Sequence, residues 1–317
     1  MDLSVIIPVL DEEANIAKLH AELHDAMTGI GRPFELLFID DGSTDGSFPL
    51  LKALAQQDPC IRVLRFRRRF GQTAALAAGI DHARGGTIIT MDADLQNDPA
   101  DIPALLAKLD EGFDIVSGWR IRRKDPFLRR RVPSMLANRL ISKLSGIHLH
   151  DYGCTLKVYR ASVLKSIRLY GEMHRFIPAL ASWLGVEVAE VPVNHRPRIH
   201  GKSKYDLTRV IRVILDLINV KFLLTYSTRP IQVFGFFGVV AFGLALAGLF
   251  TVGILRFHGV DITGNPLFLI SIMLLLMGMQ FITMGLLGEI SIRTYHETQN
   301  KRIYVIRETV GSPGEHA

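Results

Sequence analysis

Cysteine is almost absent from this sequence, which has only Cys60 and Cys154 among its 317 residues. Two thiols allow at most one disulfide, and they match no spacing of metal-ligating cysteines. We therefore expect both to be reduced thiols packed inside the fold. The first residues also lack the basic segment, short apolar core and cleavage site of a secretory signal, so none is expected.

Motifs of several common catalytic sites are missing as well. No GxGxxG or GxxxxGK(S/T) pattern follows the first apolar run, which argues against a dinucleotide-binding or P-loop site. The histidines form no HExxH zinc pattern, so we expect them to be structural or exposed. Those nearest to the other candidate residues are His148, His150, His174, His195 and His200.

Charged residues are absent from two long apolar runs, residues 231–255 and 266–288. At ~1.5 Å per residue, each run is long enough as a helix to cross a hydrocarbon core of ~30 Å. The two runs therefore predict a transmembrane hairpin of two helices.

Lysine and arginine flank this hairpin, whereas the connection between the runs has only Arg256, balanced by Asp261. Positive residues favour the cytoplasmic side of a membrane. We therefore expect an integral protein of the cytoplasmic (inner) membrane, with its active site and both termini in the cytoplasm. The flanking residues are Lys221, Arg229, Arg293, Lys301 and Arg302.

The net charge of +6 and the pI near 9.4 could indicate nucleic acid as a partner. The positive charges, however, gather in residues 65–69, 120–124, 129–131 and 196–204 of a chain with apolar runs. This placement favours anionic lipid headgroups or phosphate substrates, and no nucleic acid is expected. A scatter of solvated arginines is the alternative.

Five short apolar runs alternate with helix-like segments in the first 120 residues, which predicts an α/β fold with a mostly parallel sheet. The ends of three runs carry acidic residues, at 11–13, 40–41 and 92–94. In such sheets the ligand lies beyond the carboxyl ends of the strands, so these acids should gather at one edge. The runs are residues 3–10, 34–40, 61–66, 87–91 and 113–117, with helical segments at 15–27 and 46–57.

The remaining segments complete the predicted organisation of the chain. Residues 207–222 show apolar side chains at helical spacing, which predicts an amphipathic helix on the membrane surface or, alternatively, one packed on the soluble domain. Residues 302–310 alternate enough to form a strand that returns to the soluble part. We therefore expect a catalytic domain at 1–205, a juxtamembrane helix at 206–229, the hairpin at 230–290 and a cytoplasmic tail at 291–317.

Two carboxylates stand two residues apart after an apolar strand-like run, at Asp92 and Asp94. In an extended backbone these side chains share a face, so they could bind one divalent cation, directly or through water. Such a cation neutralises the charge of a departing diphosphate. The spacing of Asp92 and Asp94 alone is weak evidence for a cation site, but the second acidic strand end at Asp40 and Asp41 favours a functional role.

Short motifs follow one another along the chain. They are Ser4-Val-Ile-Ile-Pro8 with Asp11-Glu12, residues 39–46, Phe70-Gly71-Gln72, Asp92-Ala-Asp-Leu-Gln96, Ser117-Gly-Trp-Arg120, residues 151–157 and Gly201-Lys-Ser-Lys-Tyr205. The order of the first four resembles that of family 2 glycosyltransferases with the GT-A fold, a Rossmann-like sheet. The later ones resemble the polyprenyl-phosphate branch of that family, which includes dolichol-phosphate mannose synthases, bacterial polyprenyl-phosphate glucosyltransferases and undecaprenyl-phosphate aminoarabinose transferase.

The resemblance implies a nucleotide pocket and a metal site. Asp92, Asp94 and Gln96 would hold Mg²⁺ or Mn²⁺ and the donor diphosphate. Leu10 departs from the aromatic residue of several relatives, which leaves UDP and GDP both open. Pro8 could instead only end a strand, and Asp41 could only form a turn. The pocket would be lined by Pro8, Glu12, Asp41, Gln72 and Ala93.

An acceptor phosphate can be argued from charge and spacing. Arg130, Ser134 and Asn138 would form one polar stripe if a helix begins near Pro133. Guanidinium groups bind phosphate oxygens in pairs, and lysines act as mobile point charges. Surface arginines near anionic lipids are the alternative. The further candidates are Arg120, Arg198, Lys202 and Lys204.

A phosphate monoester has a second pKa near ~6, so it is largely ionised at neutral pH and needs no strong general base. Asp151 is therefore interpreted as an orienting or arginine-pairing residue before it is interpreted as a base. With Asp92, Asp94 and Arg120, it completes the predicted catalytic set.

These features predict an inverting, metal-dependent enzyme that moves one sugar from a nucleotide diphosphate onto polyprenyl phosphate at the cytoplasmic membrane face. Relatives with this hairpin suggest a homotetramer. One alternative is a processive polysaccharide synthase, although the chain lacks that group's Arg-Trp acceptor motif at Trp119 and Trp183. The other is a non-catalytic membrane scaffold or flippase partner, against which the intact Asp92 and Asp94 argue.

Overall fold

A computed structural model describes residues 1–121, 142, 146–167, 169, 173–197, 230–259, 265–298 and 303–311. The chain forms two compact units, one of Met1–Val220 with Arg302–Ala317 and one of Lys221–Lys301. Each unit is described by itself below. The amphipathic helix predicted at 207–222 lies outside the described residues.

The first unit is built on one eight-stranded sheet with the strand order β7-β5-β6-β4-β1-β2-β3-β8. Within it, β6 and β8 pair antiparallel with their neighbours, and the other six strands run in one direction. The predicted mostly parallel sheet is thus confirmed. The strands are β1 Leu3–Val9, β2 Phe34–Asp40, β3 Ile61–Phe66, β4 Thr87–Thr90, β5 Ile115–Trp119, β6 Lys157–Arg160, β7 Val188–Pro192 and β8 Ile306–Val310.

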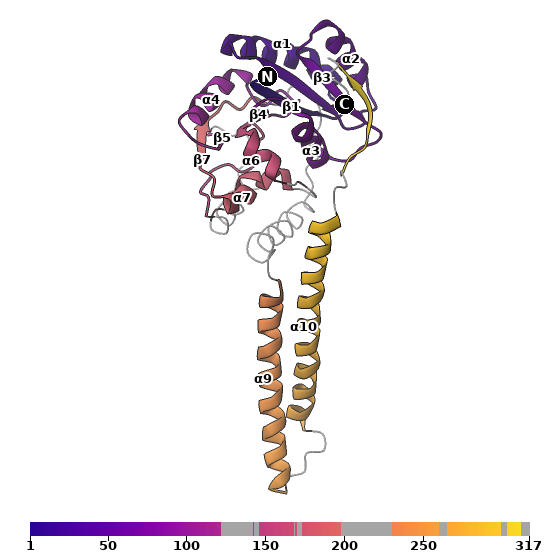
Figure 1. The fold of residues 1–317 in the computed structure, drawn as a ribbon, viewed down its shortest axis with the longest axis vertical. Coiled ribbons are helices and arrows are strands. Elements are labelled where there is room, and N and C mark those ends of the chain that lie inside the picture. Colours follow the sequence, from indigo (N-terminus) through magenta and orange to yellow (C-terminus); the bar gives the residue numbers. More distant parts are fainter. Residues whose placement is uncertain are drawn as a thin grey trace. The chain divides into compact units, whose positions relative to one another are not determined.

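Helices cover both faces of this sheet, as the period-two alternation of β1 requires (Figure 1). Val5 and Ile7 belong to the core cluster that includes residues of α1, α2 and α4. Ile6 points the other way, because a Cβ placed on Gly79 of α3 would lie 2.3 Å from its Cγ2 atom. The helices are α1 Glu13–Ile30, α2 Ser47–Gln57, α3 Gln72–His82, α4 Ile102–Asp110, α6 Ala161–Ser166 and α7 Ile177–Ala181, with 3-10 turns η1 Pro99–Asp101, η3 Met173–Phe176 and η4 Ser182–Leu184.

The chain returns to the sheet after the apolar hairpin. As predicted for residues 302–310, β8 forms there and pairs antiparallel with the edge strand β3. Just before it, Tyr304 is buried, its ring stacks on Phe66 with centroids 5.5 Å apart, and its hydroxyl donates to Asp81 at 2.7 Å. Tyr304 therefore anchors the end of the chain to β3 and α3. Cys60 and Cys154 are both free thiols, and Cys154 is buried as expected, whereas Cys60 is only partly buried.

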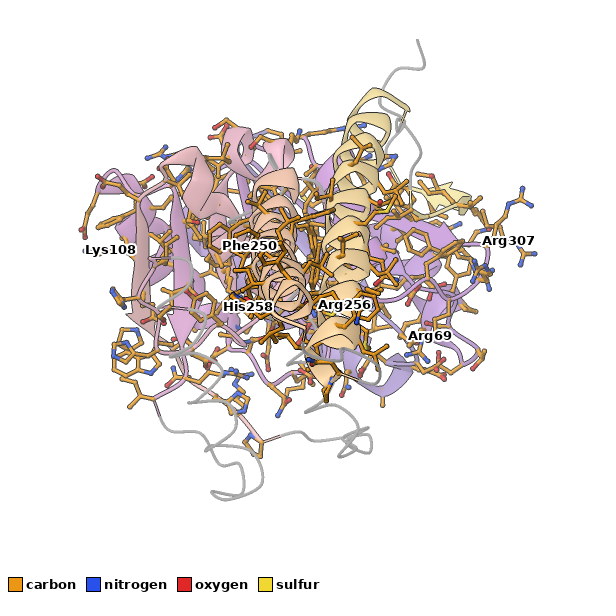
Figure 2. The ribbon with its side chains drawn as sticks, turned by 90° about the horizontal axis from the view of Figure 1, so that it is seen from below. Arg69, Lys108, Phe250, Arg256, His258 and Arg307 are labelled. Carbon is orange, nitrogen blue, oxygen red and sulfur yellow. The ribbon has the colours of Figure 1, made fainter. Side chains whose placement is uncertain are left out.

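The second unit is a helical hairpin of α9, Pro230–Phe257, and α10, Pro266–Thr298. Both helices are long and apolar enough to cross a membrane, over Phe234–Phe257 and Pro266–Gly288, with mean hydropathies of 2.3 and 2.2. Large apolar side chains such as Phe250 are exposed, and Figure 2 labels it on α9 with Arg256 and His258. Lipid contact suits this exposed apolar surface.

Small residues form the contact between α9 and α10. On α9 the buried positions recur at intervals of three and four, and on α10 at intervals of seven. A Cβ on Gly278 would lie 3.0 Å from the carbonyl oxygen of Gly238, so the two backbones nearly touch. Small residues permit such close packing in membranes, where no hydrophobic drive joins helices. The positions are Gly238, Ala241, Ala245, Gly248 and Val252 on α9, and Ser271, Gly278 and Gly285 on α10.

We expect Gly278→Leu to separate the helices and lower the thermal unfolding midpoint of the detergent-solubilised protein. A Cβ at Gly278 meets Phe242 at 2.8 Å, and such overpacking costs about 1–3 kcal/mol. The matched control is Gly243→Leu on α9, where a Cβ meets nothing within 4 Å. Equal midpoints for the two variants would contradict this packing.

Candidate functional site

The acidic strand ends meet at one edge of the sheet, as expected. In the parallel pairing of β1 and β2, Val9 lies opposite Asp40, while Ile6 lies opposite Thr90 at the end of β4. The segments that follow these strands therefore emerge side by side. They carry Asp11 to Glu13, Asp41 and Asp92 to Asp94.

The loops after β1 and β2 are joined by hydrogen bonds between side chains and backbone. Asp11 Oδ1 accepts from the Thr44 amide at 2.8 Å, and Asp11 has a positive φ of 55°. The Glu12 amide donates to Ser47 Oγ at 2.9 Å, while its carboxylate accepts from Asn15 Nδ2 at 2.6 Å. Glu12 thus lies at the predicted edge and holds the start of α1. Pro8 lies half-buried inside β1, one residue before its end.

Asp41 fixes the loop that leads into α3. Its buried carboxylate accepts from the amides of Phe70 at 2.6 Å and Gly71 at 2.9 Å. Burial raises the pKa of Asp41, and these two hydrogen bonds oppose the rise. Gly42, at a φ of 75°, packs against this loop, because a Cβ there would lie 2.8 Å from the carbonyl carbon of Arg68. Asp41 therefore does more than close a turn.

Gln72 connects this loop to the paired carboxylates. It is the first residue of α3, and its Nε2 atom donates to Asp92 Oδ1 at 2.8 Å. Two of the residues predicted for the nucleotide pocket, Asp41 and Gln72, are thereby linked to the predicted metal site.

The backbone at Asp92 and Asp94 is not the extended strand that the sequence predicts. β4 ends at Thr90, residues 93–95 form a bend, and Leu95 has a positive φ of 60°. Burial of Leu95 in the core holds this bend in place. Burial and the neighbouring Asp94 charge nevertheless raise the pKa of Asp92 to about 6.

The carboxylate pair fits a divalent cation. A cation there would offset the repulsion that raises the pKa of Asp92. No group of three or more potential His, Cys, Asp or Glu ligands occurs in the described part of the chain. Mg²⁺ and Mn²⁺ suit this arrangement, since carboxylates, waters and phosphate oxygens together complete their coordination.

The Gln96 amide donates to Asp94 Oδ1 at 3.2 Å, which places Gln96 beside the pair. Ala93 is buried in the core, so only its backbone can reach a nucleotide.

Arg120 and Asp151 form a bidentate ion pair at the end of β5. Nε of Arg120 donates to Oδ2 of Asp151 at 2.6 Å, and Nη2 donates to Oδ1 at 2.9 Å. Asp151 is only 2% exposed. The structure thus makes Asp151 the arginine-pairing residue of the sequence-based interpretation, because a carboxylate so engaged is poorly placed to accept a substrate proton.

The neighbours of this ion pair strengthen it. The Trp119 and His150 rings stack with centroids 4.3 Å apart. Trp119 and Arg120 on one segment therefore lie against His150 and Asp151 on the other. The Glu190 carboxylate of β7 accepts from the amides of His150 at 2.8 Å and Asp151 at 3.0 Å. Glu190 was not among the predicted site residues, because nothing local marks a strand glutamate as a partner of backbone 40 residues away.

Lys157, at the start of β6, is a second residue that the sequence-based prediction did not include in the site. Its side chain is 3% exposed, and Nζ donates to the carbonyl oxygens of Tyr152 at 3.0 Å and Cys154 at 2.5 Å. Burial lowers the pKa of Lys157. No local pattern in the short strand Lys157-Val-Tyr-Arg160 marks this lysine as buried.

Arg196 corrects the interpretation of residues 196–204 as one basic segment for lipid or phosphate. Its guanidinium pairs with Asp98 at 2.7 Å and Glu22 at 2.5 Å, and its amide donates to the Gln96 carbonyl at 2.9 Å. Arg196 therefore anchors its segment to the loop after Asp94. The remaining predicted acceptor residues lie outside the described residues: Arg130, Ser134, Asn138, Arg198, Lys202 and Lys204.

Comparisons with known proteins agree with this geometry. The sequence pattern described as glycosyl transferase family 2 matches residues 4–168. The chain is 42% identical to dodecaprenyl-phosphate galacturonate synthase of Rhizobium johnstonii, over 97% of this chain and 93% of that protein. It is 37% identical to undecaprenyl-phosphate 4-deoxy-4-formamido-L-arabinose transferase of Pseudomonas paraeruginosa, over 97% and 90%.

Among solved structures, the chain is similar to glucosyl-3-phosphoglycerate synthase from Mycobacterium tuberculosis. That structure contains Mn²⁺, uridine diphosphate and phosphoglyceric acid. The TM-score is 0.55 at 20% identity, with 70% of this chain and 77% of that chain covered. This likeness shows a shared fold.

We expect Asp92→Asn to stabilise the protein at pH 7 in the presence of a metal chelator. Folding raises the pKa of Asp92 from 3.8 to about 6, so the folded state binds this proton more strongly than the unfolded state. The free energy of unfolding therefore falls as the pH rises from about 4 to about 6, by up to about 3 kcal/mol. Thermal unfolding should show a midpoint several degrees above wild type at pH 7, with a gain that shrinks toward pH 4.

The control is Asp110→Asn, since Asp110 has 64% of its side chain exposed. A gain for Asp92→Asn that is the same at every pH would contradict a raised pKa at this carboxyl.

Proposed function

The chain belongs to glycosyl transferase family 2, and from this premise we propose that it transfers a single sugar from a nucleotide diphosphate sugar to a polyprenyl phosphate. The observation that carries the proposal is the placement of two charged pairs at one sheet edge: the half-buried Asp92 with the buried Asp94, and the half-buried Arg120 with the buried Asp151. The carboxylate pair suits a cation with a diphosphate. Arg120 and Asp151 flank, in the sequence, the segment that carries the predicted acceptor stripe. Full-length similarity to two polyprenyl-phosphate enzymes supports the substrate class.

On the donor side, we assign the nucleotide to the loops that emerge at the ends of β1, β2 and β3, and the diphosphate to the carboxylate pair. A bound Mg²⁺ or Mn²⁺ supplies charge neutralisation for the departing diphosphate. Asp92 and Asp94 hold the cation, with Gln96 beside them, and the hydrogen bond from Gln72 orients Asp92. The nucleoside is uridine or guanosine. The nucleotide residues are Pro8, Glu12, Asp41, Gln72 and the Ala93 backbone.

On the acceptor side, we assign the phosphate to Arg130, Ser134 and Asn138, with Arg198, Lys202 and Lys204 closing over it. Arg120, held by Asp151, contributes a guanidinium in a fixed orientation. The ionised phosphate attacks the anomeric carbon directly, and the bond from that carbon to the nucleoside diphosphate breaks as the new bond forms. This single displacement inverts the anomeric configuration. No group needs to remove a proton from the acceptor at neutral pH.

We assign this chemistry to a membrane. Two apolar helices and the polyprenyl lipid of the relatives support an integral membrane protein. We assign it to the cytoplasmic membrane with the active site and both termini in the cytoplasm, from the distribution of lysine and arginine around the hairpin. We further propose a homotetramer, which size-exclusion chromatography with light scattering can test.

The enzyme is expected to form a lipid-linked sugar from undecaprenyl phosphate and one member of a panel of radiolabelled UDP and GDP sugars. The panel includes a galacturonate donor and a 4-formamido-arabinose donor, since these sugars distinguish the two relatives. Asp92→Ala with Asp94→Ala should lower the rate at least a hundredfold, whereas Asp110→Ala, at an exposed side chain at the end of α4, should not. No lipid product from any donor, or full activity of the double variant, would refute the proposal.

Arg130→Ala is expected to raise the KM for undecaprenyl phosphate roughly tenfold or more while the donor KM changes little, because a charge-assisted phosphate contact is lost. The control is Arg139→Ala, nine residues further on and on the opposite side of the predicted helix. Initial rates at varied lipid and donor concentrations separate the two constants. Equal effects of Arg130→Ala and Arg139→Ala would refute the stripe.

A further inference from the structure

Lys157 is the one lysine that is buried among the described residues. A lone ammonium group is costly to remove from water, so a buried lysine requires compensating partners. Two carbonyl oxygens, of Tyr152 and Cys154, accept from its Nζ atom at 3.0 and 2.5 Å. Both belong to the segment that begins at Asp151. Lys157 therefore closes that segment onto the start of β6.

The sheet brings this lysine to the carboxylate pair. β6 is antiparallel to β4, and Lys157 lies directly opposite Thr90, the last residue of β4 and two residues before Asp92. The Thr90 hydroxyl also donates to the Thr155 carbonyl at 2.8 Å. The segment with Asp151 is thus held against the end of β4 from two sides.

Charges of alternating sign follow one another across this region. Asp92 and Asp151 favour the charged form of Lys157, and Lys157 and Arg120 favour the charged form of Asp92. Arg120 in turn pairs with Asp151. Burial lowers the pKa of Lys157, and the nearby carboxylates of Asp92 and Asp151 oppose that effect, so Lys157 is a counter-charge to the donor carboxylates and to the ion pair on the acceptor side.

We propose that Lys157 is a positioning residue: its charge weakens the hold of Asp92 and Asp94 on their divalent cation, and its hydrogen bonds orient Asp151 toward Arg120. The inference rests on the proposed function, because it takes Asp92 and Asp94 as the cation site. Lys157 then links the cation site on the donor side to the Arg120–Asp151 ion pair on the acceptor side. Both effects follow from contacts of the ammonium group rather than from contact with a substrate.

The test measures Mn²⁺ binding to the purified full-length protein by electron paramagnetic resonance, without substrates. Lys157→Gln removes the charge but keeps a hydrogen-bond donor, and Lys157→Met removes both. We expect both variants to bind Mn²⁺ roughly three- to tenfold more tightly, because a positive charge near the cation is gone. Transfer to undecaprenyl phosphate should nevertheless slow at least tenfold in Lys157→Met, because Asp151 loses its support. General damage to the fold would weaken binding and turnover together.

Two variants serve as controls. Lys157→Arg keeps the charge and should bind Mn²⁺ within about twofold of wild type. Lys165→Gln removes another lysine that donates to a backbone carbonyl, that of Ala83 at 2.8 Å, beyond the other end of β4, and should change neither quantity.

The outcomes separate this inference from the proposed function. Mn²⁺ binding that is unchanged or weaker in folded Lys157→Gln would overturn the role of Lys157. If, in the same experiment, the wild-type protein binds Mn²⁺ and Asp92→Asn abolishes that binding, the proposed cation site would still stand. Wild-type protein that binds no Mn²⁺ would overturn the cation site and the inference with it. Circular dichroism and thermal unfolding establish that each variant is folded.

Discussion

The crowding of negative charge at the end of β4 is the constraint on which the rest of the site depends. Asp92 lies half-buried beside the buried Asp94, and its pKa rises because it is partly removed from water and a like charge is near. The surrounding groups compensate: Gln72 donates to Asp92, and Lys157 and Arg120 favour its ionised form. An ionised pair in this environment is prepared for a cation and costs the protein stability without one.

This arrangement follows from the topology of the sheet. Six strands run in one direction, so their following loops emerge at one edge, and Asp41 draws the loop before Gln72 toward that edge. The antiparallel strand β6 runs the opposite way and begins where β4 ends. It therefore brings Lys157 and the segment after Asp151 to the carboxylates. The sheet thus brings Asp92 and Asp94, which follow a parallel strand, together with Lys157 of the reversed strand.

The two helices of the hairpin are held together in a different way from the elements of the first unit. In the first unit, large apolar side chains fill the core between helices and sheet, and burial of these side chains stabilises the fold. In the second unit, large side chains face outward and small residues form the helix contact. Lipid offers large side chains an apolar environment on the outside, so close approach of two backbones is what holds the helices together.

The sequence by itself determined strands β1 to β5, the apolar spans, the returning strand β8 and the gathering of acids at one edge, because these features depend on local periodicity and on strand direction. Only the tertiary structure decided which charges meet. Arg120 and Asp151 are 31 residues apart, Glu22 and Arg196 are 174 residues apart, and Glu190 holds backbone 40 residues away. The bend at residues 93–95 depends likewise on the core around Leu95 rather than on its own pattern. Long-range partners and burial set the roles of Lys157 and Arg196, and neither is visible until the chain has folded.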